Sequence, residues 1–396
     1  MDLVKSFQNE NLKNKIALLR TDYNVPTNGK LILDSTRIDE SIPTIKALLE
    51  KEAKIIILTH RGRPKGKIDI SLSMEPVARE LEKKIMLPIR LINKLDEDIR
   101  VYDEKIFLFE NLRFYPNEEE NDQDFAHKLS KLGDIYINDA FAASHRAHAS
   151  LSGIPKFIPS YFGICMTKEI LALNTIFENP NRPVVALIGG SKVSSKIQLL
   201  KNLILKVDSI IIGGAMANTF LKVRGIAIGA SLFEESCLQI ANEILDLAEQ
   251  NNVNLIFPKD AKVSKTLQDD PSAMNKSLDQ IEQDDMILDL GIESSKMIGG
   301  LLADAKTVIW NGPLGAIEFK PFEEATVYVA ERLAKMCVEN NTSVVVGGGD
   351  TIYGINIANT YSSYTHVSTG GGAFLEWLEG KDLPGVRAVI ENQREG

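Results

Sequence analysis

The stretch Ser343-Val344-Val345-Val346-Gly347-Gly348-Gly349-Asp350-Thr351 joins a β-branched run to three consecutive glycines. A short β-branched run that ends in a glycine-rich turn is typical of a buried strand that leads into a helix. Similar runs recur along the chain and alternate with amphipathic segments, which indicates βαβ units and a buried parallel sheet. The sequence therefore predicts an α/β fold.

The expected strands fall into two groups. In the first half we expect strands at 16–19, 54–59, 105–109 and 134–138, with helices such as 38–49 and 75–84. In the second half we expect strands at 184–188, 209–212, 254–257, 307–310, 343–346 and 366–368. Between the groups, Asn179-Pro180-Asn181-Arg182-Pro183 ends a helix whose N-cap we expect at Thr167. A chain of 396 residues is long enough for two domains of ~100–200 residues each.

Composition narrows the class of protein. A net charge of −9 repels a polyphosphate backbone, so a nucleic-acid partner is not expected and an anion site requires a local concentration of cations. The cysteines, Cys165, Cys237 and Cys337, lack CxxC spacing, which fits neither a disulfide framework nor a structural zinc site. The apolar runs are far shorter than the ~20 residues that span a bilayer. These features favour a cytoplasmic protein without a membrane segment.

Arginine and histidine gather where the first-half strands are expected to end. The segments are Arg20-Thr21-Asp22-Tyr23-Asn24, His60-Arg61-Gly62-Arg63, Glu110-Asn111-Leu112-Arg113 and Asn138-Asp139-Ala140, followed by His145-Arg146-Ala147-His148. Ligands of α/β sheets bind at the carboxyl ends of the strands. One such arginine alone is usually a solvated surface charge. Their recurrence at strand ends predicts a pocket for a small polyanion, because guanidinium groups bind phosphate or carboxylate bidentately.

Glycine takes the corresponding positions in the second half. The junctions are Gly189-Gly190-Ser191-Lys192, Gly213-Gly214-Ala215, Asn311-Gly312-Pro313-Leu314-Gly315, Gly347-Gly348-Gly349-Asp350-Thr351 and Gly370-Gly371-Gly372. A single junction of this kind is most simply a tight turn. Five of them predict a surface where a ligand approaches the backbone and where helix N-termini face phosphate oxygens, as nucleotide binding requires.

Several polar residues near these junctions are candidates for the site. Lys192 and Lys196 stand four apart, and we expect both on one face of a helix that starts after Gly190 and points them at an anion. Asp350 is either a magnesium ligand or a helix N-cap. His60, His145 and His148 lack the spacing of a zinc site and are interpreted as hydrogen-bond donors to an anion. The P-loop and dinucleotide-binding signatures are absent from the sequence.

Longer motifs match one family. They are Arg20-Thr21-Asp22-Tyr23-Asn24-Val25-Pro26, Asp34-Ser35-Thr36-Arg37-Ile38, His60-Arg61-Gly62-Arg63-Pro64, Glu110-Asn111-Leu112-Arg113-Phe114, residues 138–150, Gly189-Gly190-Ser191-Lys192-Val193, Lys196-Ile197, Gly213-Gly214-Ala215-Met216-Ala217, Trp310-Asn311-Gly312-Pro313, residues 347–351 and residues 369–373. In this order they resemble phosphoglycerate kinase over essentially the whole chain.

The resemblance implies a fold, a division of the chain and a reaction. It implies two Rossmann-like three-layer domains with mostly parallel sheets facing a central cleft. Residues 1–166 form an N-terminal 3-phosphoglycerate-binding domain, 167–180 an interdomain helix, 181–372 a C-terminal nucleotide-binding domain, and 373–396 a segment that returns to the N-terminal domain. The implied enzyme is a cytoplasmic monomer of glycolysis and gluconeogenesis. It interconverts 1,3-bisphosphoglycerate plus ADP with 3-phosphoglycerate plus ATP, by in-line transfer on hinge closure with Mg²⁺.

The resemblance also implies a role for individual residues. The expected ligands of 3-phosphoglycerate are Asp22, Asn24, Arg37, His60, Arg63, Arg113 and Arg146. The groups expected at the migrating phosphoryl are Arg37, Lys192, Gly371 and Gly372. The expected nucleotide site comprises Lys196, Gly213, Gly291, Asn311, Glu318, Gly348, Gly349, Asp350 and Thr351. Within it, Glu318 takes the ribose hydroxyls, Gly213 and Gly291 border the adenine, and Asp350 holds the magnesium.

Some positions depart from the commonest form of the family. They are Arg61 for Leu, Ala142-Ala143-Ser144 where Gly often leads, Lys259 for Val, Ile292 for Pro and Phe374 for Ser. None of them removes a ligand-bearing side chain.

Two other functions share part of this pattern. Another ATP-dependent kinase of a small acidic metabolite fits the composition, but it predicts no match at residues 34–38 or 138–150. A non-enzymatic anion-binding module explains the arginines, but it leaves Lys192, Lys196 and residues 347–350 without a task.

Overall fold

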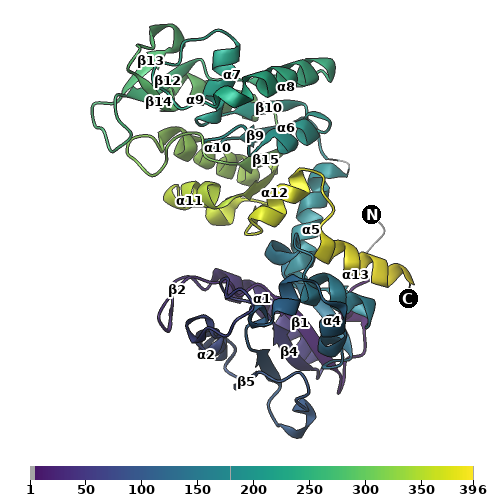
Figure 1. Cartoon of the computed structure of the whole chain (residues 1–396). Coiled ribbons are helices and arrows are strands. Elements are labelled where there is room, and N and C mark those ends of the chain that lie inside the picture. Colours follow the sequence, from purple (N-terminus) through teal and green to yellow (C-terminus); the bar gives the residue numbers. More distant parts are fainter. Residues whose placement is uncertain (1–4, 179, 396) are drawn as a thin grey trace. The chain divides into compact units, whose positions relative to one another are not determined.

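The chain forms two compact units, as seen in a computed structural model that describes residues 5–178 and 180–395 (Figure 1). The first unit contains the described residues up to Ile170 together with those from Asp382 onward, and the second runs from Leu171 to Lys381. Each unit has its own six-stranded sheet. Among the described helices, none has the length and apolar character that a membrane span requires.

The first sheet is parallel throughout its described pairings. In spatial order its strands are β5 (Ile89–Ile92), β6 (Ile106–Phe109), β4 (Lys54–Leu58), β1 (Ile16–Thr21), β7 (Ile135–Asp139) and β8 (Ser160–Phe162). A parallel sheet is covered on both faces, so its inner strands are apolar at nearly every position. The sequence of β4, Lys-Ile-Ile-Ile-Leu, has this character.

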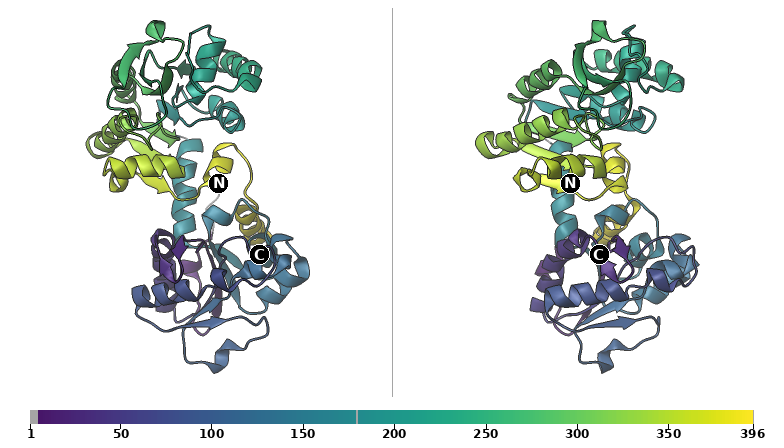
Figure 2. Two further views of the ribbon diagram at one scale, coloured as in Figure 1. Left: turned by 60° about the vertical axis from the view of Figure 1, so that its left-hand side comes forward. Right: turned by 90° about the vertical axis from the view of Figure 1, so that its left-hand side faces the viewer.

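Helices of the first unit cover this sheet. They are α1 (Thr36–Glu50), α2 (Glu75–Ile85), α3 (Pro116–Glu119), α4 (Gln123–Ser130), α5 (Ile164–Phe177), which continues into the second unit, and α13 (Pro384–Glu395). One face of the sheet packs its alternate residues, such as Leu19 and Ile57, against Ile45 of α1 and Leu81 of α2. Figure 2 shows α13, in yellow, beside the blue segments of the first unit, where it packs on η6 (Ala149–Gly153).

The second sheet is also parallel in its described pairings. In spatial order its strands are β11 (Asn254–Ile256), β10 (Ser209–Ile212), β9 (Val184–Ile188), β15 (Thr307–Asn311), β16 (Ser343–Gly347) and β17 (His366–Ser368). Numbered along the chain this is the order 3-2-1-4-5-6 of a Rossmann fold. Together with the first sheet it confirms the predicted α/β class.

The helices of the second unit lie on both faces of this sheet. They are α6 (Ile197–Ile204), α7 (Met216–Val223), α8 (Leu238–Gln250), α9 (Ile292–Leu302), α10 (Glu324–Asn340), α11 (Gly349–Ile357) and α12 (Gly372–Leu378). The core on one face joins Leu187 and Trp310 of the sheet to Ile298 of α9 and Val329 of α10. A small antiparallel sheet of β13 (Met274–Ser277), β12 (Asp260–Ser264) and β14 (Met286–Leu290) adjoins it, and β2 (Thr27–Asn28) pairs with β3 (Leu31–Ile32) in the first unit.

The predicted N-cap at Thr167 is wrong, because α5 already begins at Ile164. The backbone N–H of Ile164 donates to Thr44 Oγ1 at 2.9 Å, and that of Met166 donates to Asp139 Oδ1 at 2.8 Å. Side chains from α1 and β7 therefore satisfy the first turn of α5, and Thr167 bonds back to the carbonyl of Gly163 inside the helix. The helix ends at Phe177, shortly before the predicted break, of which residue 179 lies outside the described residues.

The helix expected to carry both lysines also begins later than predicted, at Ile197. Lys192 lies in the preceding turn, where the N–H and hydroxyl of Ser194 both donate to the carboxylate of Glu234. The turn closes when the N–H of Lys196 donates to the carbonyl of Val193 at 2.8 Å. Only Lys196, at the N-cap, adjoins α6.

The chain passes between the units after α12, not before it. Asn202 of α6 donates to the carbonyl of Leu378, which holds α12 in the second unit. Residues 382–395 belong to the first unit, where Asn392 Oδ1 accepts from the N–H of Ser160 at 2.9 Å.

Candidate active site

The first candidate site lies at the carboxyl edge of the first sheet, where β1 and β7 are neighbours. The chain first adds β4, β5 and β6 on one side of β1 and then β7 and β8 on the other side. The direction in which strands are added therefore reverses between β1 and β7. Such a reversal leaves a crevice at the strand ends, which is the usual place for a ligand in this kind of sheet. The predicted anion ligands lie on the segments after β1, β4, β6 and β7, except for Arg37, which lies in the first turn of α1.

Three of these predicted ligands form one connected group. Arg37, in the first turn of α1, places Nη1 2.8 Å from Asp22 Oδ2 and 3.4 Å from the carbonyl oxygen of Asn24. The side chain of Asn24 accepts from the N–H of Gly62 at 2.9 Å. The loops after β1 and β4 are therefore tied to the start of α1. The Arg37 side chain keeps 32% of its surface exposed, so it can still reach a ligand.

Two further predicted ligands, His60 and Arg113, are buried behind this group. Arg113 Nη1 donates to the carbonyl of Gly62 at 2.7 Å, and its Nε lies 3.3 Å from Glu119 Oε1. Burial lowers the pKa of Arg113 to about 10, and this group still carries its charge at neutral pH. Burial, followed by the positive charges of Arg20 and Arg113, lowers the pKa of His60 well below its usual value. The site thus combines fixed positive charges with a neutral imidazole.

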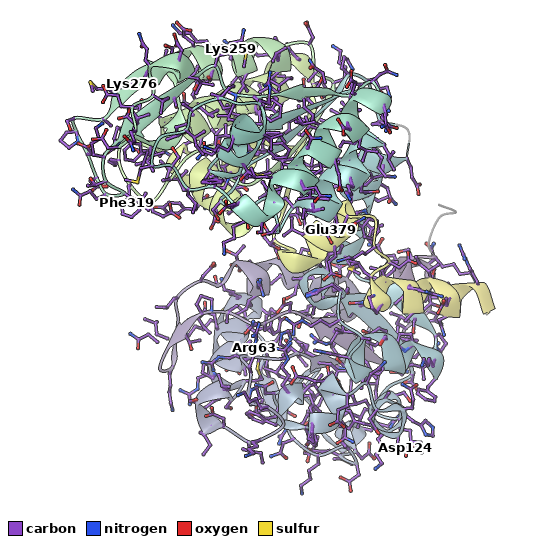
Figure 3. The ribbon with its side chains drawn as sticks, turned by 45° about the horizontal axis from the view of Figure 1, so that its top comes forward. Arg63, Asp124, Lys259, Lys276, Phe319 and Glu379 are labelled. Carbon is purple, nitrogen blue, oxygen red and sulfur yellow. The ribbon has the colours of Figure 1, made fainter. Side chains whose placement is uncertain are left out.

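The loop after β7 adds one more arginine and further histidines. Arg146 is partly buried and its Nε donates to His145 Nε2 at 3.3 Å. Burial and the charges of Arg20 and Arg113 lower the pKa of His148 to about 3, so this histidine is also neutral. Arg63 differs from the others, since it is exposed on the surface of the unit (Figure 3).

Three residues of this cluster escaped the sequence analysis as site residues: Arg20, Glu118 and Ser150. Arg20 is fully buried although it is an arginine, and its Nε donates to Ser150 Oγ at 2.8 Å. Ser150 Oγ in turn donates to Glu118 Oε1 at 2.5 Å. The available signal was an arginine inside an otherwise apolar strand, because a buried arginine requires partners.

The second candidate site lies at the carboxyl edge of the second sheet, between β9 and β15, where the winding again reverses. Here hydrogen bonds join the backbones of neighbouring junctions. The N–H of Gly189 donates to the carbonyl of Asn311 at 2.9 Å, and that of Gly190 donates to the carbonyl of Pro313 at 3.0 Å. The N–H of Gly214 donates to the carbonyl of Leu314 at 2.9 Å. Three of the glycine-rich junctions therefore form one surface.

The glycines of these junctions serve two purposes. A Cβ at Gly189 or Gly312 would overlap the backbone of the other junction, so these glycines permit the close contact of the loops. A Cβ at Gly190, Gly349 or Gly371 would meet nothing within 4 Å. Gly190 and Gly371 also have positive φ values of 113° and 52°, which favour glycine, and all three positions leave backbone open to an approaching ligand.

A polar network joins the junctions to Lys196. Its Nζ donates to Asn311 Oδ1, and Asn311 Nδ2 donates to the carbonyl of Gly347 at 2.7 Å. Thr351 Oγ1 accepts from the N–H of Gly312 at 2.7 Å. Burial lowers the pKa of Lys196 to about 8, an effect that the negative charges of Glu379 and Asp350 oppose. The structure thus brings Lys196, Asn311 and Thr351 together at the start of α11.

The remaining predicted nucleotide residues differ in their surroundings. Lys192, Glu318, Gly349 and Asp350 are exposed. Gly213 is buried, and a Cβ there would lie 2.5 Å from Leu314 Cδ2. Gly291 precedes α9, and a Cβ there would overlap the carboxylate of Asp260, which caps this helix through the N–H of Ser294 at 2.7 Å. These two glycines have packing reasons of their own.

Three departures from the family pattern have structural explanations. Phe374 is fully buried, and a Cβ at Gly347 would overlap its ring, so this phenylalanine packs directly on the end of β16. Arg61 is buried and donates to the carbonyl of Ser73 at 2.8 Å. Ile292 is 51% exposed, so this substitution does not alter the packing of the core.

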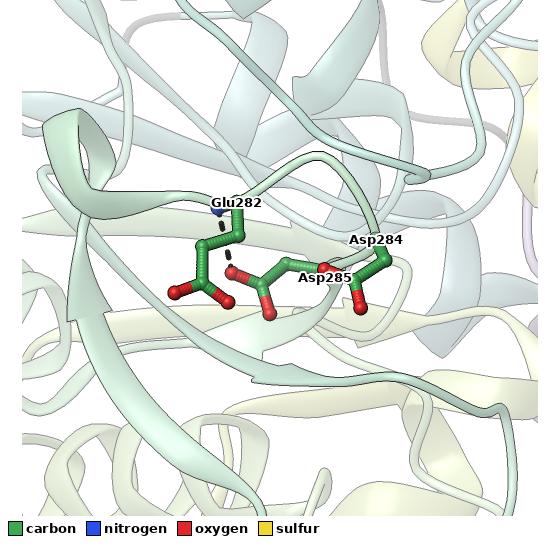
Figure 4. A group of neighbouring side chains, drawn as sticks. All are labelled: Glu282, Asp284 and Asp285. Carbon is green, nitrogen blue, oxygen red and sulfur yellow. Dashed lines mark hydrogen bonds between the residues drawn. The ribbon is translucent and has the colours of Figure 1, made fainter.

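One acidic group outside both sites has the geometry of a cation ligand set. Glu282, Asp284 and Asp285 lie together after β13, and the N–H of Glu282 donates to Asp285 Oδ2 at 2.7 Å (Figure 4). Lys265 Nζ lies 3.0 Å from Glu282 Oε2 and Lys276 Nζ lies 2.8 Å from Asp285 Oδ2. The two lysines offset two of the three negative charges, and the group is an ion-pair network at the edge of the small sheet.

Comparison with known families decides the identity. The model of the family described as phosphoglycerate kinase matches residues 7–381. The chain belongs to the phosphoglycerate kinase family. Members catalyse phosphoryl transfer between ATP and 3-phosphoglycerate in glycolysis, and this activity is the function of the chain. The sequence analysis is confirmed on this point, and the alternative of another kinase is not favoured.

Curated relatives and solved structures agree with this assignment. Phosphoglycerate kinase of Dictyoglomus turgidum is 42% identical and covers 98% of this chain and 99% of its own. That of Caulobacter vibrioides is also 42% identical, over 97% of this chain and 99% of its own. The structure of the Coxiella burnetii enzyme has a TM-score of 0.93 at 39% identity, over 99% of this chain and 100% of its own. The Pyrococcus horikoshii structure has a TM-score of 0.81 at 28% identity, over 98% of this chain and 99% of its own.

Proposed function

We propose that the first unit binds 3-phosphoglycerate and that the second binds Mg-ATP or Mg-ADP. The observation that carries this division is the contrast between the two crevices. The first gathers arginines around neutral histidines, as a small polyanion requires, and the second offers open glycine backbone beside the partly buried Lys196, as a nucleotide polyphosphate requires.

Within the first unit the proposed ligands of 3-phosphoglycerate comprise a connected group and a flanking group. The connected group is Asp22, Asn24 and Arg37, and the flanking residues are His60, Arg63, Arg113 and Arg146. Arg37 has the exposed guanidinium of the connected group and also faces the migrating phosphoryl in this proposal.

Within the second unit the proposed nucleotide ligands comprise side chains and backbone. The phosphates are held by Lys196, Asn311, Gly348, Gly349, Asp350 and Thr351, the ribose by Glu318, and the adenine lies between Gly213 and Gly291. Lys192 and the backbone of Gly371 and Gly372 stabilise the phosphoryl group during transfer.

Asp350 is the proposed protein ligand of the magnesium ion. Mg²⁺ in phosphoryl-transfer sites is usually bound by one or two carboxylates, with substrate phosphates and water completing the shell. A single exposed carboxylate in the first turn of α11, close enough to Lys196 to affect its pKa, fits this donor set. When bound, the ion neutralises charge on the phosphate oxygens.

The residues account for the chemistry of the transfer. The acceptor carboxylate is ionised at neutral pH, so the reaction requires no general base. The transition state requires neutralisation of the charge on the phosphoryl oxygens, which Arg37 and Lys192 supply as fixed cations.

Because the two ligand sets belong to different units, we place the transfer in a closed form reached by hinge motion. Small-angle scattering that detects no compaction with both substrates bound would contradict this step.

The test of the reaction is a coupled assay of ATP consumption with 3-phosphoglycerate and Mg²⁺, read as NADH oxidation by glyceraldehyde-3-phosphate dehydrogenase. We expect activity that disappears when 3-phosphoglycerate or Mg²⁺ is omitted. Activity that persists in chelator would remove the metal from the proposal. The proposed enzyme is a cytoplasmic monomer, and light scattering at assay concentration tests its oligomeric state.

A further inference from the structure

A chain of hydrogen bonds connects a fully buried carboxylate to His60 across three elements of the first unit. Glu118 of α3 accepts from the N–H of Ser150 at 2.9 Å and from its hydroxyl at 2.5 Å. Ser150 Oγ accepts from Arg20 Nε at 2.8 Å, and Arg20 Nη2 lies 3.2 Å from His60 Nδ1. The backbone of Ser150 is anchored as well, because its carbonyl accepts from the hydroxyl of Tyr136 at 2.8 Å.

The protons of this chain can be assigned by counting donors. A serine hydroxyl has one proton, and at 2.5 Å from a carboxylate oxygen this proton belongs to the bond with Glu118. Ser150 Oγ can therefore only accept from Arg20. A guanidinium has donors and no acceptor, so Arg20 Nη2 must donate to His60 Nδ1. His60 Nδ1 carries no proton, and the proton of a neutral ring is on Nε2.

The charges around His60 favour the same state. Arg20 approaches from β1, Arg113 from the segment after β6 and Arg37 from α1, while His148, itself neutral, approaches from the loop after β7. The nearest negative charge in the chain of bonds is Glu118, which Ser150 and Arg20 separate from the ring. A second proton on His60 would add a charge to a cationic cluster and break the bond from Arg20.

We propose that Glu118 and Ser150 are positioning residues for substrate binding. Through Arg20 they fix His60 as the Nε2–H tautomer, so that the ring presents one permanent N–H donor and no titratable charge to the anion. This inference rests on the proposed role of the first unit in binding 3-phosphoglycerate. It assigns the specificity of the cluster to an oriented neutral donor held among fixed cations.

The direct test is the protonation state of His60 in the ligand-free protein. Long-range ¹H–¹⁵N spectra of ¹⁵N-histidine-labelled enzyme, assigned with His60→Gln, distinguish the two tautomers and the imidazolium. We expect the pattern of an unprotonated Nδ1 and a protonated Nε2, unchanged from about pH 6 to about pH 8, where an ordinary histidine titrates. An Nδ1–H tautomer, or titration near the usual pKa, would overturn the proposal without any variant.

Variants then test the roles of the positioning residues. Ser150→Ala removes the link between Glu118 and Arg20, and we expect the KM for 3-phosphoglycerate to rise about tenfold or more while the KM for ATP is unchanged. The fixed tautomer pattern of His60 should be lost in this variant, and Ser150→Thr, which keeps the hydroxyl, should restore both properties. The matched control is Ser152→Ala in the same helix, whose hydroxyl donates to the carbonyl of His148 and not to this chain.

Two outcomes separate this proposal from the binding proposal on which it rests. If the His60 signals show the expected tautomer but do not move on addition of 3-phosphoglycerate, the substrate binds elsewhere and the binding proposal fails. If they move on addition but Ser150→Ala behaves like Ser152→Ala in the KM and in the tautomer pattern, the positioning role of Ser150 and Glu118 is wrong.

Discussion

Both units have a candidate site at the carboxyl edge of a parallel sheet, where the strand order reverses. The two sites differ in the groups that they offer to a ligand. At the β1–β7 reversal the proposed ligands are side chains, and several of them, including His60 and Arg113, are buried. At the β9–β15 reversal the surface is glycine backbone, with Lys196 as its partly buried cation. A parallel sheet fixes where a ligand can bind, and the residues after the strands decide which ligand it is.

The difference has electrostatic consequences. Burial, assisted by the neighbouring cations, lowers the pKa of His60 and of His148 and keeps both neutral, so the charge of that site changes little around neutral pH. In the second site, open backbone provides donors whose strength does not depend on ionisation, and Lys196 is the group that titrates near physiological pH. Substitutions should therefore affect the first site through lost charge and the second through lost backbone geometry.

The largest effect is expected from Arg37, a partly exposed cation of the first site. We expect Arg37→Ala to lower kcat at least about 100-fold, because arginine stabilisation of phosphoryl transfer contributes a thousandfold or more in other enzymes. Nucleotide binding should change much less. Lys192→Ala should behave in the same way if it follows the transferred group.

Steady-state kinetics with Arg79→Ala as control test this prediction. Arg79 is an exposed arginine of α2 that pairs with Glu75 on the same helix, so its loss should leave kcat near normal. A near-normal kcat for Arg37→Ala would remove this residue from the transition state and would weaken the contrast between a side-chain site and a backbone site.

A smaller effect is expected from one added methyl group in the second site. Gly348 has a φ of 102°, and a Cβ there would lie 2.8 Å from Asn311 Nδ2. We expect Gly348→Ala to lower the free energy of unfolding by about 1–3 kcal/mol and to raise the KM for ATP, with the KM for 3-phosphoglycerate unchanged. Thermal unfolding and kinetics measure both quantities.

Gly300→Ala is the matched control. Gly300 lies within α9, and a Cβ there would meet nothing within 4 Å. Alanine should raise stability by about 0.5–1 kcal/mol at such a helical position and leave both KM values unchanged. If the two alanine variants were equally stable and equally active, the backbone at Gly348 would not be a constrained part of the site.

The sequence predicted the inner strands well for a physical reason. Strands buried on both faces are nearly continuous apolar runs, and the inner strands β9 and β10 have the expected bounds. Strands with a polar or exposed side were missed, such as β13, whose sequence is Met-Asn-Lys-Ser, and the edge strand β5. Their pairing depends on neighbours that are distant in the chain.

The errors at helix starts have the same origin. Thr167 has the right chemistry for an N-cap, but Thr44 and Asp139 perform that function three residues earlier, from other elements. Local sequence cannot reveal a cap supplied by residues more than 20 positions away. The helix predicted for Lys192 was wrong for a similar reason, since Glu234 holds that segment in a turn.

For the site, residue type and strand-end position identified the cations but not their support. His60 and Arg113 were predicted as ligands, and the structure brings them together with Arg37. Arg20, Ser150 and Glu118 were missed because their importance lies in mutual contacts between β1, η6 and α3. The individual ligand roles in both units remain predictions, which the variants above test.

The smallest effect concerns pH. Burial lowers the pKa of Lys196 to about 8 from its ordinary value of 10.5, so the nucleotide-free protein loses this charge as pH rises through about 8. Nucleotide phosphates, whose last proton has a pKa near 6, stay fully charged in that range. Affinity for ATP should therefore fall severalfold between about pH 7.5 and about pH 9, whereas affinity for 3-phosphoglycerate, bound by arginines and a neutral histidine, should stay constant.

Calorimetry across this range, with Lys196→Arg as the control, tests that prediction. The arginine keeps its charge, so the variant should bind ATP with an affinity independent of pH.

The free energy of unfolding should change in the opposite direction. Between about pH 8 and about pH 10.5 the folded state binds fewer protons than the unfolded state, so this group adds stability as pH rises. Weaker ATP binding together with a higher free energy of unfolding would assign the proton to Lys196, because a general loss of structure at high pH would lower both. If ATP affinity in the unsubstituted enzyme were constant over this range, Lys196 would not contact the phosphates, and the nucleotide site would consist of backbone and the remaining side chains.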